Sequence, residues 1–168
     1  MATGIDEAHR TVPTVRLVFT PFVRMFYSVH MFERWFYIST SRLGAVQVDE
    51  QVRDIVDVSR PRNRLLGVTG ALLFTGRRFA QYLEGTPAAI AELKQSIIRD
   101  PRHEDVRTIA SGPYDVRRFL TWSLAYAGPS RFIANKVEDA LNDALQGNIE
   151  SVEPLAEVLA GFAVEGHG

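Results

Sequence analysis

The chain alternates between two hydrophobic patterns, one typical of β-strands and the other typical of amphipathic helices. Strand-like residues begin at Glu33, where a run rich in aromatic side chains follows an irregular N-terminal stretch. Two later apolar runs are joined by a short turn at Gly76, which predicts a β-hairpin. A turn at Gly112-Pro113 separates the last two strand-like segments. We expect strands at residues 33–39, 67–74, 78–83, 107–110 and 117–126.

Four segments place apolar residues at helical spacing. The first, about residues 48–59, is expected to end before Pro61, because a residue that precedes proline avoids the α region. The second begins at Thr86-Pro87, with threonine as the N-cap and proline at the first helical position. Two more helices follow Gly128-Pro129 and are separated by Gly147-Asn148. The expected apolar faces are Val48, Val52, Ile55 and Val56; Ile90, Leu93, Ile97 and Ile98; Phe132, Ile133, Val137, Leu141 and Leu145; and Val152, Leu155, Val158, Leu159 and Phe162.

The resulting order, β-α-β-β-α-β-β, contains the ferredoxin-like βαββαβ arrangement and an additional strand, so the expected fold class is α+β. The two C-terminal helices are expected to cap the open face of the sheet. We divide the 168 residues into an N-terminal extension at 1–31, a folded domain at 32–127 and capping helices at 128–163. The extension is either a disordered arm or a segment upstream of a biological start at Met31.

Composition narrows the classes of function. The net charge of −1 argues against a broad phosphate-binding surface, and so against direct binding of nucleic acid. The most apolar stretch, residues 17–32, is too short for a membrane span and contains Arg24. Asp6 and Glu7 stand where a secretory signal would be basic, which makes a cytoplasmic location the default expectation. The sequence has no cysteine, and its histidines lack metal-ligand spacing, so we expect neither thiolate chemistry nor a metal site.

Three polar side chains lie in apolar surroundings. Gln81 lies between Phe79 and Leu83 at the two-residue period of a strand, so all three should face the interior. Burying a glutamine without a partner costs about 1–3 kcal/mol, and the plain alternative is that a neighbouring side chain or a water molecule satisfies it. Tyr37, taken alone, is a core tyrosine whose hydroxyl bonds a backbone carbonyl. Asn63 follows the first helix and, taken alone, is a turn-forming residue.

Other candidate residues have equally plain alternatives. Arg102 and His103 follow the second helix, where the helix dipole favours basic side chains. Trp122 is as consistent with core packing as with a functional role. No glycine-rich nucleotide-binding motif is present, and no Ser/His/Asp grouping or carboxylate pair stands out.

Five blocks of sequence, in matching order and spacing, resemble the BLUF domain family of small blue-light sensors that bind FAD. They cover residues 32–126, and the resemblance identifies 32–127 as the flavin-binding domain. The absence of cysteine also excludes the cysteinyl-flavin chemistry of the rival LOV domains. The five blocks are Phe36-Tyr37-Ile38-Ser39, Asn63 with Gly67-Val68-Thr69-Gly70, Phe79-Ala80-Gln81-Tyr82-Leu83-Glu84-Gly85, Arg99-Asp100-Pro101-Arg102-His103, and Thr121-Trp122-Ser123-Leu124.

The resemblance implies roles for five residues. Tyr37 looks like the electron and proton donor to the excited flavin, and Gln81 like the hydrogen-bond switch between them. Asn63 and Arg102 match residues that bind the carbonyl edge of the flavin, and an amide has both the donor and the acceptor that this edge requires. His103 matches a residue near the ring and the ribityl chain.

The last strand and the end of the first helix depart from the family pattern. Trp122 looks like the family's relay tryptophan, but Leu124 stands where many members have methionine, so a Trp–Met exchange cannot occur in that form. Arg62 occupies a position where other members have His or Asn, and its planar cation can stack on an aromatic ring. Ser59 and Arg62 complete the expected cofactor-binding set.

The sequence therefore predicts a blue-light photoreceptor that uses FAD as its cofactor. We expect this photoreceptor not to be an enzyme. Its signal is expected to reach a separate signalling protein, and we expect a homo-oligomer. Two alternatives stay open. A small flavin-dependent oxidoreductase would need a hydride-donor site, and a colourless ferredoxin-like interaction module would bind no flavin.

Overall fold

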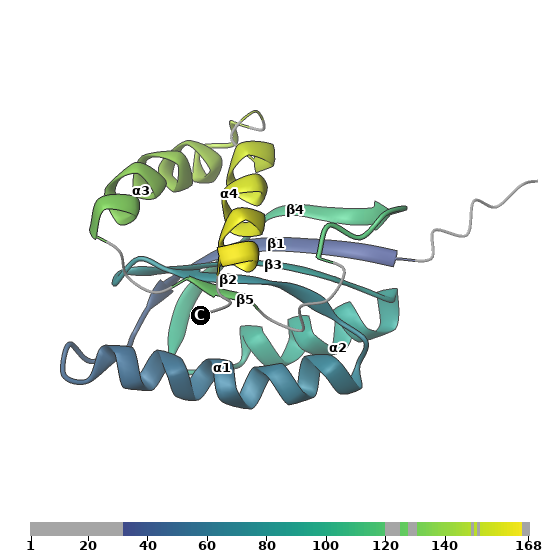
Figure 1. Cartoon of the computed structure of the whole chain (residues 1–168), viewed down its shortest axis with the longest axis horizontal. Coiled ribbons are helices and arrows are strands. Elements are labelled where there is room, and N and C mark those ends of the chain that lie inside the picture. The colour runs from purple at the N-terminus through teal and green to yellow at the C-terminus, as the bar shows by residue number, and fades with distance from the viewer. Residues whose placement is uncertain (1–31, 120–124, 128–130, 149, 151, 166–168) are drawn as a thin grey trace, which may run out of the picture.

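The computed structural model describes residues 32–119, 125–127, 131–148, 150 and 152–165. Within these residues the chain forms one sheet with helices on both faces (Figure 1). The predicted N-terminal extension at 1–31 lies outside the described residues. The elements are β1 (Phe32–Ser41), α1 (Val48–Leu65), β2 (Thr69–Phe74), β3 (Arg78–Gly85), α2 (Pro87–Ile98), β4 (His103–Tyr114), β5 (Ala125–Ala127), α3 (Arg131–Leu145) and α4 (Val152–Glu165).

The strand order across the sheet is β4-β1-β3-β2-β5. The first four strands pair antiparallel, and β5 extends the sheet by pairing parallel to β2. This is the ferredoxin-like arrangement with an added edge strand, so the predicted α+β fold class is confirmed. The hairpin between β2 and β3 turns at Gly76, whose φ of 92° is readily adopted only by glycine.

Helix α1 is longer than the sequence predicts. It continues through Pro61 to Leu65, so the expectation that proline would end it is wrong. Proline removes only its own backbone hydrogen bond, and the following turn is held by a C-terminal cap. The N–H of Val68 donates to the carbonyl of Asn63, and Gly67 adopts a φ of 63°. Asn63 therefore lies in the last helical turn and is not a residue of the following loop.

The start of α2 is as predicted. Thr86 is extended, and its hydroxyl accepts a hydrogen bond from the N–H of Ala89 at 3.3 Å, while Pro87 opens the helix. Its predicted apolar face is correct except at the end. Ile90 and Leu93 are buried, whereas Ile98 is 55% exposed.

Two layers of core lie on opposite faces of the sheet. Figure 1 shows α1 and α2 on one face and α3 and α4 on the other, so the predicted capping role of the C-terminal helices is confirmed. Side chains of β1 and β3 alternate between these layers, as the two-residue period of a strand requires. Of the predicted apolar face of α4, Val158 is the exception among the described side chains, with 39% of its surface exposed.

The last strands differ most from the sequence prediction. Strand β4 runs on through Gly112 and Pro113, where a turn was expected. Proline is tolerated because β4 is an edge strand, where a missing N–H need not break a ladder between two neighbours. Of the predicted strand at 117–126, only residues 125 and 126 belong to the sheet among the described residues, in the short strand β5 (Ala125–Ala127). No helix among the described residues is long and apolar enough to cross a membrane.

Candidate functional site

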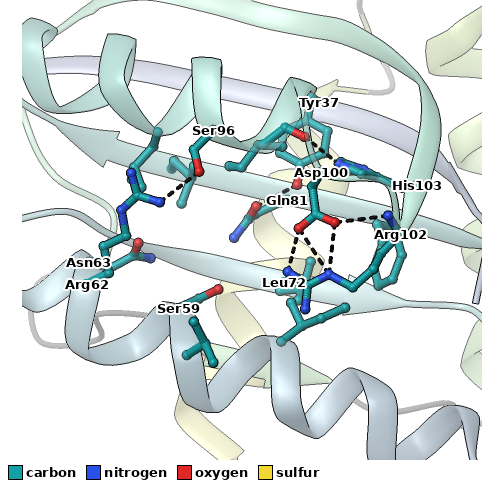
Figure 2. Close-up of a pocket in the computed structure, with 16 residues that line it drawn as sticks. Tyr37, Ser59, Arg62, Asn63, Leu72, Gln81, Ser96, Asp100, Arg102 and His103 are labelled. Carbon is teal, nitrogen blue, oxygen red and sulfur yellow. Dashed lines mark hydrogen bonds and ion pairs between the residues drawn. The ribbon is translucent and has the colours of Figure 1, made fainter.

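A cavity opens between the sheet and the two helices α1 and α2, and encloses about 750 Å³ including its open mouth (Figure 2). Strands β1 and β3 supply its floor, and the end of α2 with the following loop closes one side. Seven of the site residues predicted from sequence line this single cavity: Tyr37, Ser59, Arg62, Asn63, Gln81, Arg102 and His103.

Tyr37 and Gln81 are hydrogen-bonded at the floor of the cavity. The Tyr37 hydroxyl donates to Oε1 of Gln81 at 2.7 Å. Both side chains are buried, with exposed fractions of 3% and 6%. Since Oε1 accepts from the phenol, the amide Nε2 is directed away from Tyr37, and Figure 2 shows it pointing into the cavity.

Tyr37 packs against a neighbouring side chain of β1. Its ring stacks on Trp35, with ring centroids 4.4 Å apart and planes at 25°, and the indole Nε1 donates to Thr108 at 3.0 Å. The register between β1 and β4 shifts between Phe36 and Tyr37, a type of irregularity that re-aims side chains beside functional sites. Burial raises the pKa of the Tyr37 phenol well above its ordinary value, and the negative charge of Asp100 raises it further.

The last turns of α1 form the second wall. Asn63 is only 3% exposed and lines the cavity with Ser59, which lies one turn earlier on the same helix. Arg62 also lines the cavity, but its guanidinium group reaches α2. It donates to the Ser96 hydroxyl at 2.7 Å and to the Glu92 carboxylate at 3.1 Å. Arg62 therefore bridges the two helices at the edge of the cavity.

Arg102 is paired with a carboxylate inside the cavity. Its Nε donates to both oxygens of Asp100, at 2.9 and 3.0 Å, and its terminal nitrogen makes a further ion pair (Figure 2). The hydrogen bond with Arg102 holds the pKa of Asp100 below its ordinary value, and Asp100 raises the pKa of Arg102 in return. Asp100 is not among the site residues predicted from sequence, although its position two residues before an arginine was a signal of such a pair.

His103 begins β4 and is fixed through both ring nitrogens. Nε2 lies 2.6 Å from the carbonyl of Ile97, and Nδ1 lies 2.7 Å from the hydroxyl of Ser39. A carbonyl only accepts, so Nε2 carries a proton, and in the neutral ring Nδ1 accepts from Ser39. These bonds tie the end of α2 to β1 and orient the imidazole along the cavity wall.

The apolar lining was only partly foreseen. Phe79 and Leu83 share the cavity face of β3 with Gln81, as their spacing predicts. Ile55, Leu72 and Leu93 complete the wall, and their role depends on helix packing that the sequence alone does not show. Trp122 and Leu124, the predicted relay residues, lie outside the described residues.

The lining fits a flat heteroaromatic ring with a polar edge. Apolar side chains from α1, α2 and β3 can cover the faces of such a ring. Two buried carboxamides, Asn63 and Gln81, face the same space, and each offers a donor and an acceptor. Gln81 Nε2 in particular is a donor directed into the cavity, as the carbonyl of a flavin would require.

Comparison with known proteins agrees with this geometry. The family described as BLUF, sensors of blue light using FAD, matches residues 32–125, more than half of the chain. Photoactivated adenylate cyclase subunit alpha of Euglena gracilis is 34% identical over 91 residues, which are 54% of this chain and 9% of that protein. The chain thus spans about a tenth of the length of this curated relative.

Solved structures give the same assignment. The dark-state structure of BlrB, a BLUF protein, has a TM-score of 0.68 and 31% identity, and the match covers 79% of this chain and 97% of BlrB. Klebsiella pneumoniae BlrP1, solved with FMN and cyclic diGMP, has a TM-score of 0.58 and 29% identity, covering 81% of this chain and 35% of BlrP1. The chain belongs to the BLUF family of blue-light sensors.

Proposed function

We propose that residues 32–127 form a photoreceptor domain that binds FAD in the cavity between the sheet and helices α1 and α2. The observation that carries this proposal is the buried hydrogen bond from Tyr37 to Gln81, with the second polar group of the amide directed into the cavity. The chain's role is to sense light, not to catalyse a reaction. Bound FAD would supply the blue-light absorption and, once excited, an acceptor for one electron.

Tyr37 acts as the electron donor. Loss of an electron makes the phenol O–H strongly acidic, and the proton then leaves along the 2.7 Å hydrogen bond to Gln81 Oε1. The raised pKa of Tyr37 keeps this proton on the phenol in the dark. The residue therefore releases its proton only when light has removed an electron.

Gln81 acts as the switch. After it has received the proton, its side chain rotates or tautomerises before the electron and proton return to Tyr37. The amide then presents a different donor to the cavity than it does in the dark. A stronger hydrogen bond to the cofactor's carbonyl lowers the excitation energy, so absorbance shifts to the red while the cofactor stays oxidised.

The remaining polar residues hold the cofactor. Asn63 on α1 would bind the carbonyl edge of the cofactor, and so would Arg102, which Asp100 keeps in place in the loop after α2. His103, Ser59 and Arg62 line the same cavity and would complete the set.

The signal leaves through a partner. We propose that the rearranged Gln81 biases the last strand, with Trp122 and Leu124 as relay residues, and the capping helices at 128–163. A separate signalling protein or a second copy of the chain then reads this change. One similar protein is named a photoactivated adenylate cyclase subunit, so an effector enzyme is an expected recipient of the signal.

Purified protein tests this function in two steps. The cofactor is released by denaturation and identified by chromatography against FAD and FMN standards, and FAD is expected. The absorbance spectrum of the intact protein is then recorded in the dark and after blue light, and a reversible red shift is expected. A colourless protein that binds no added flavin, or a flavin spectrum that only bleaches, would contradict the proposal.

A further inference from the structure

Residues 117–119, which we name the docked segment, lie against the sheet just before residues 120–124. Arg117 anchors its first position. The guanidinium group donates to the carbonyl of Gly67 at 2.7 Å and to the hydroxyl of Thr69 at 3.1 Å. Gly67 belongs to the C-terminal cap of α1, the helix that carries Asn63, so this anchor begins beside the cofactor cavity.

Glu84 anchors the other two positions. Its carboxylate accepts the backbone N–H of Arg118 at 2.9 and 3.0 Å, and the N–H of Phe119 at 3.1 Å. The Glu84 side chain has no exposed surface, and Phe119 is 2% exposed. The Phe119 ring packs against Tyr82, at a centroid distance of 5.8 Å. The docked segment is thus held by a buried charge on β3.

This carboxylate is unusual for a purely structural residue. No side chain of Lys or Arg among the described residues forms a salt bridge with Glu84, and its carboxylate accepts hydrogen bonds from backbone N–H groups instead. Burial raises the pKa of Glu84, and the N–H groups of Phe119 and Arg118, together with the positive charges of Arg118 and Arg117, oppose that rise. A buried charge that no salt bridge compensates is costly. A neutral residue would hold the segment less firmly but would cost less to bury.

The docked segment also reaches the C-terminal helices. The Arg118 guanidinium group makes an ion pair with Glu153 in the first turn of α4. The backbone of Arg118 is therefore tied to β3 and its side chain to α4. A shift of the segment relative to the sheet changes a contact of α4 directly.

We propose that Glu84 is a positioning residue that couples the cavity face of β3 to α4 through the docked segment; this rests on the function proposed above. Gln81 and Glu84 lie three residues apart on β3 and face opposite sides of the sheet. On either side of residues 120–124 the chain is anchored to the sheet. Phe119 donates its N–H to Glu84 of β3, and Ala125 pairs with Ala71 of β2. A rearrangement beside Gln81 shifts the segment at its Glu84 anchor, and Arg118 transmits the shift to Glu153.

Hydrogen exchange with mass spectrometry tests both links on the flavin-bound protein. Deuterium uptake across α4 is compared in the dark and under continuous blue light, in parallel with the absorbance red shift. Glu84→Gln keeps the shape but places an amide NH₂ against a backbone N–H, and Glu153→Gln removes the ion pair at an exposed site. Glu157→Gln, one turn further along α4 and exposed, is the matched control.

We expect deuterium uptake across α4 to differ between light and dark in the wild type and in Glu157→Gln. We expect this difference to be lost in Glu84→Gln and Glu153→Gln. All four proteins should keep the red shift. A simple loss of stability would raise exchange in the dark and in the light equally, and so would leave the difference in place. If Glu84→Gln does not fold, Glu153→Gln decides the test, since it alters only an exposed ion pair.

Three results would overturn the proposal. Glu84→Gln or Glu153→Gln could keep the wild-type difference in deuterium uptake across α4, which would show that the contact made by that glutamate does not transmit the signal. The wild type could shift to the red with no change in α4, which would refute this coupling and leave the photoreceptor function intact. A wild type that shows no red shift at all would refute the photoreceptor function itself.

Discussion

The hydroxyl of Tyr37 donates a 2.7 Å hydrogen bond to Gln81, its direct cross-strand partner in the pairing of β1 with β3. The register of the sheet therefore places the two side chains next to each other. Both face the cavity between strands and helices. In the proposed mechanism, the photochemical donor and its proton acceptor are thereby held in place before light arrives, which is the geometric requirement for fast proton transfer.

Replacing Gln81 tests the switch and its structural cost together. Gln81→Leu leaves the buried Tyr37 hydroxyl without its partner, which should lower the free energy of unfolding by about 1–3 kcal/mol. Flavin should still bind, but the red shift should disappear. Chemical denaturation and absorbance measure the two effects. Gln95→Leu, the same change at an exposed position of α2, is the control and should leave both unchanged. A normal red shift in Gln81→Leu would refute the switch.

The buried phenol predicts an unusual response to high pH. Because burial and the charge of Asp100 raise its pKa, Tyr37 should stay protonated at pH 10.0, the ordinary tyrosine value. The size of the red shift should therefore be constant from neutral pH through pH 10.0. In the unfolded chain Tyr37 ionises near pH 10.0, whereas in the folded protein it stays protonated. Above pH 10.0 this difference makes the free energy of unfolding fall as the pH rises, and Tyr37→Phe should remove the contribution of Tyr37 to that fall. Loss of the red shift with a midpoint near 10.0 would contradict this account.

The pattern of the sequence was enough to predict most of the fold. The two-residue period of β3 correctly placed Gln81 on the same buried face as Phe79 and Leu83. Thr86-Pro87 correctly marked the start of α2, because a cap and an N-terminal proline act locally. These features depend on neighbouring residues in the chain, which a sequence shows directly.

The errors come from effects that act across the fold. Pro61 stays inside α1 because the cap around Gly67 holds the last turn, and Pro113 stays inside β4 because that strand lies at an edge. Asp100 and Ser96 enter the site only because α2 packs beside α1. Tertiary packing decides such positions, and one sequence does not display it.

Removing the amide of Asn63 should weaken flavin retention. Asn63→Ala loses a donor and an acceptor at the cavity wall, so the flavin dissociation constant should rise by roughly tenfold or more, the equivalent of one to two hydrogen bonds. The red shift of the fraction that keeps flavin should be unaffected. Fluorescence titration with FAD measures the affinity, and Asn148→Ala, an exposed position after α3, serves as the control. Unchanged affinity would place Asn63 outside the binding set.

The contribution of Asp100 to the free energy of unfolding should decrease at acid pH. Its pKa is lowered chiefly by Arg102, so its contribution is present above the ordinary value of 3.8 and is lost as pH falls through its lower folded value. Asp100→Asn should lower the free energy of unfolding at neutral pH more than at acid pH. Urea denaturation of both proteins at two pH values measures this. An equal loss at both would show that the ion pair with Arg102 contributes nothing.

The central claim is that Tyr37 starts the light reaction through Gln81. The most direct test is the blue-light difference spectrum of Tyr37→Phe, recorded beside the wild type and Tyr114→Phe, a tyrosine of β4 that does not line the cavity. We expect all three to carry oxidised flavin, with a reversible red shift in the wild type and in Tyr114→Phe and none in Tyr37→Phe. A wild-type red shift in Tyr37→Phe would contradict the account.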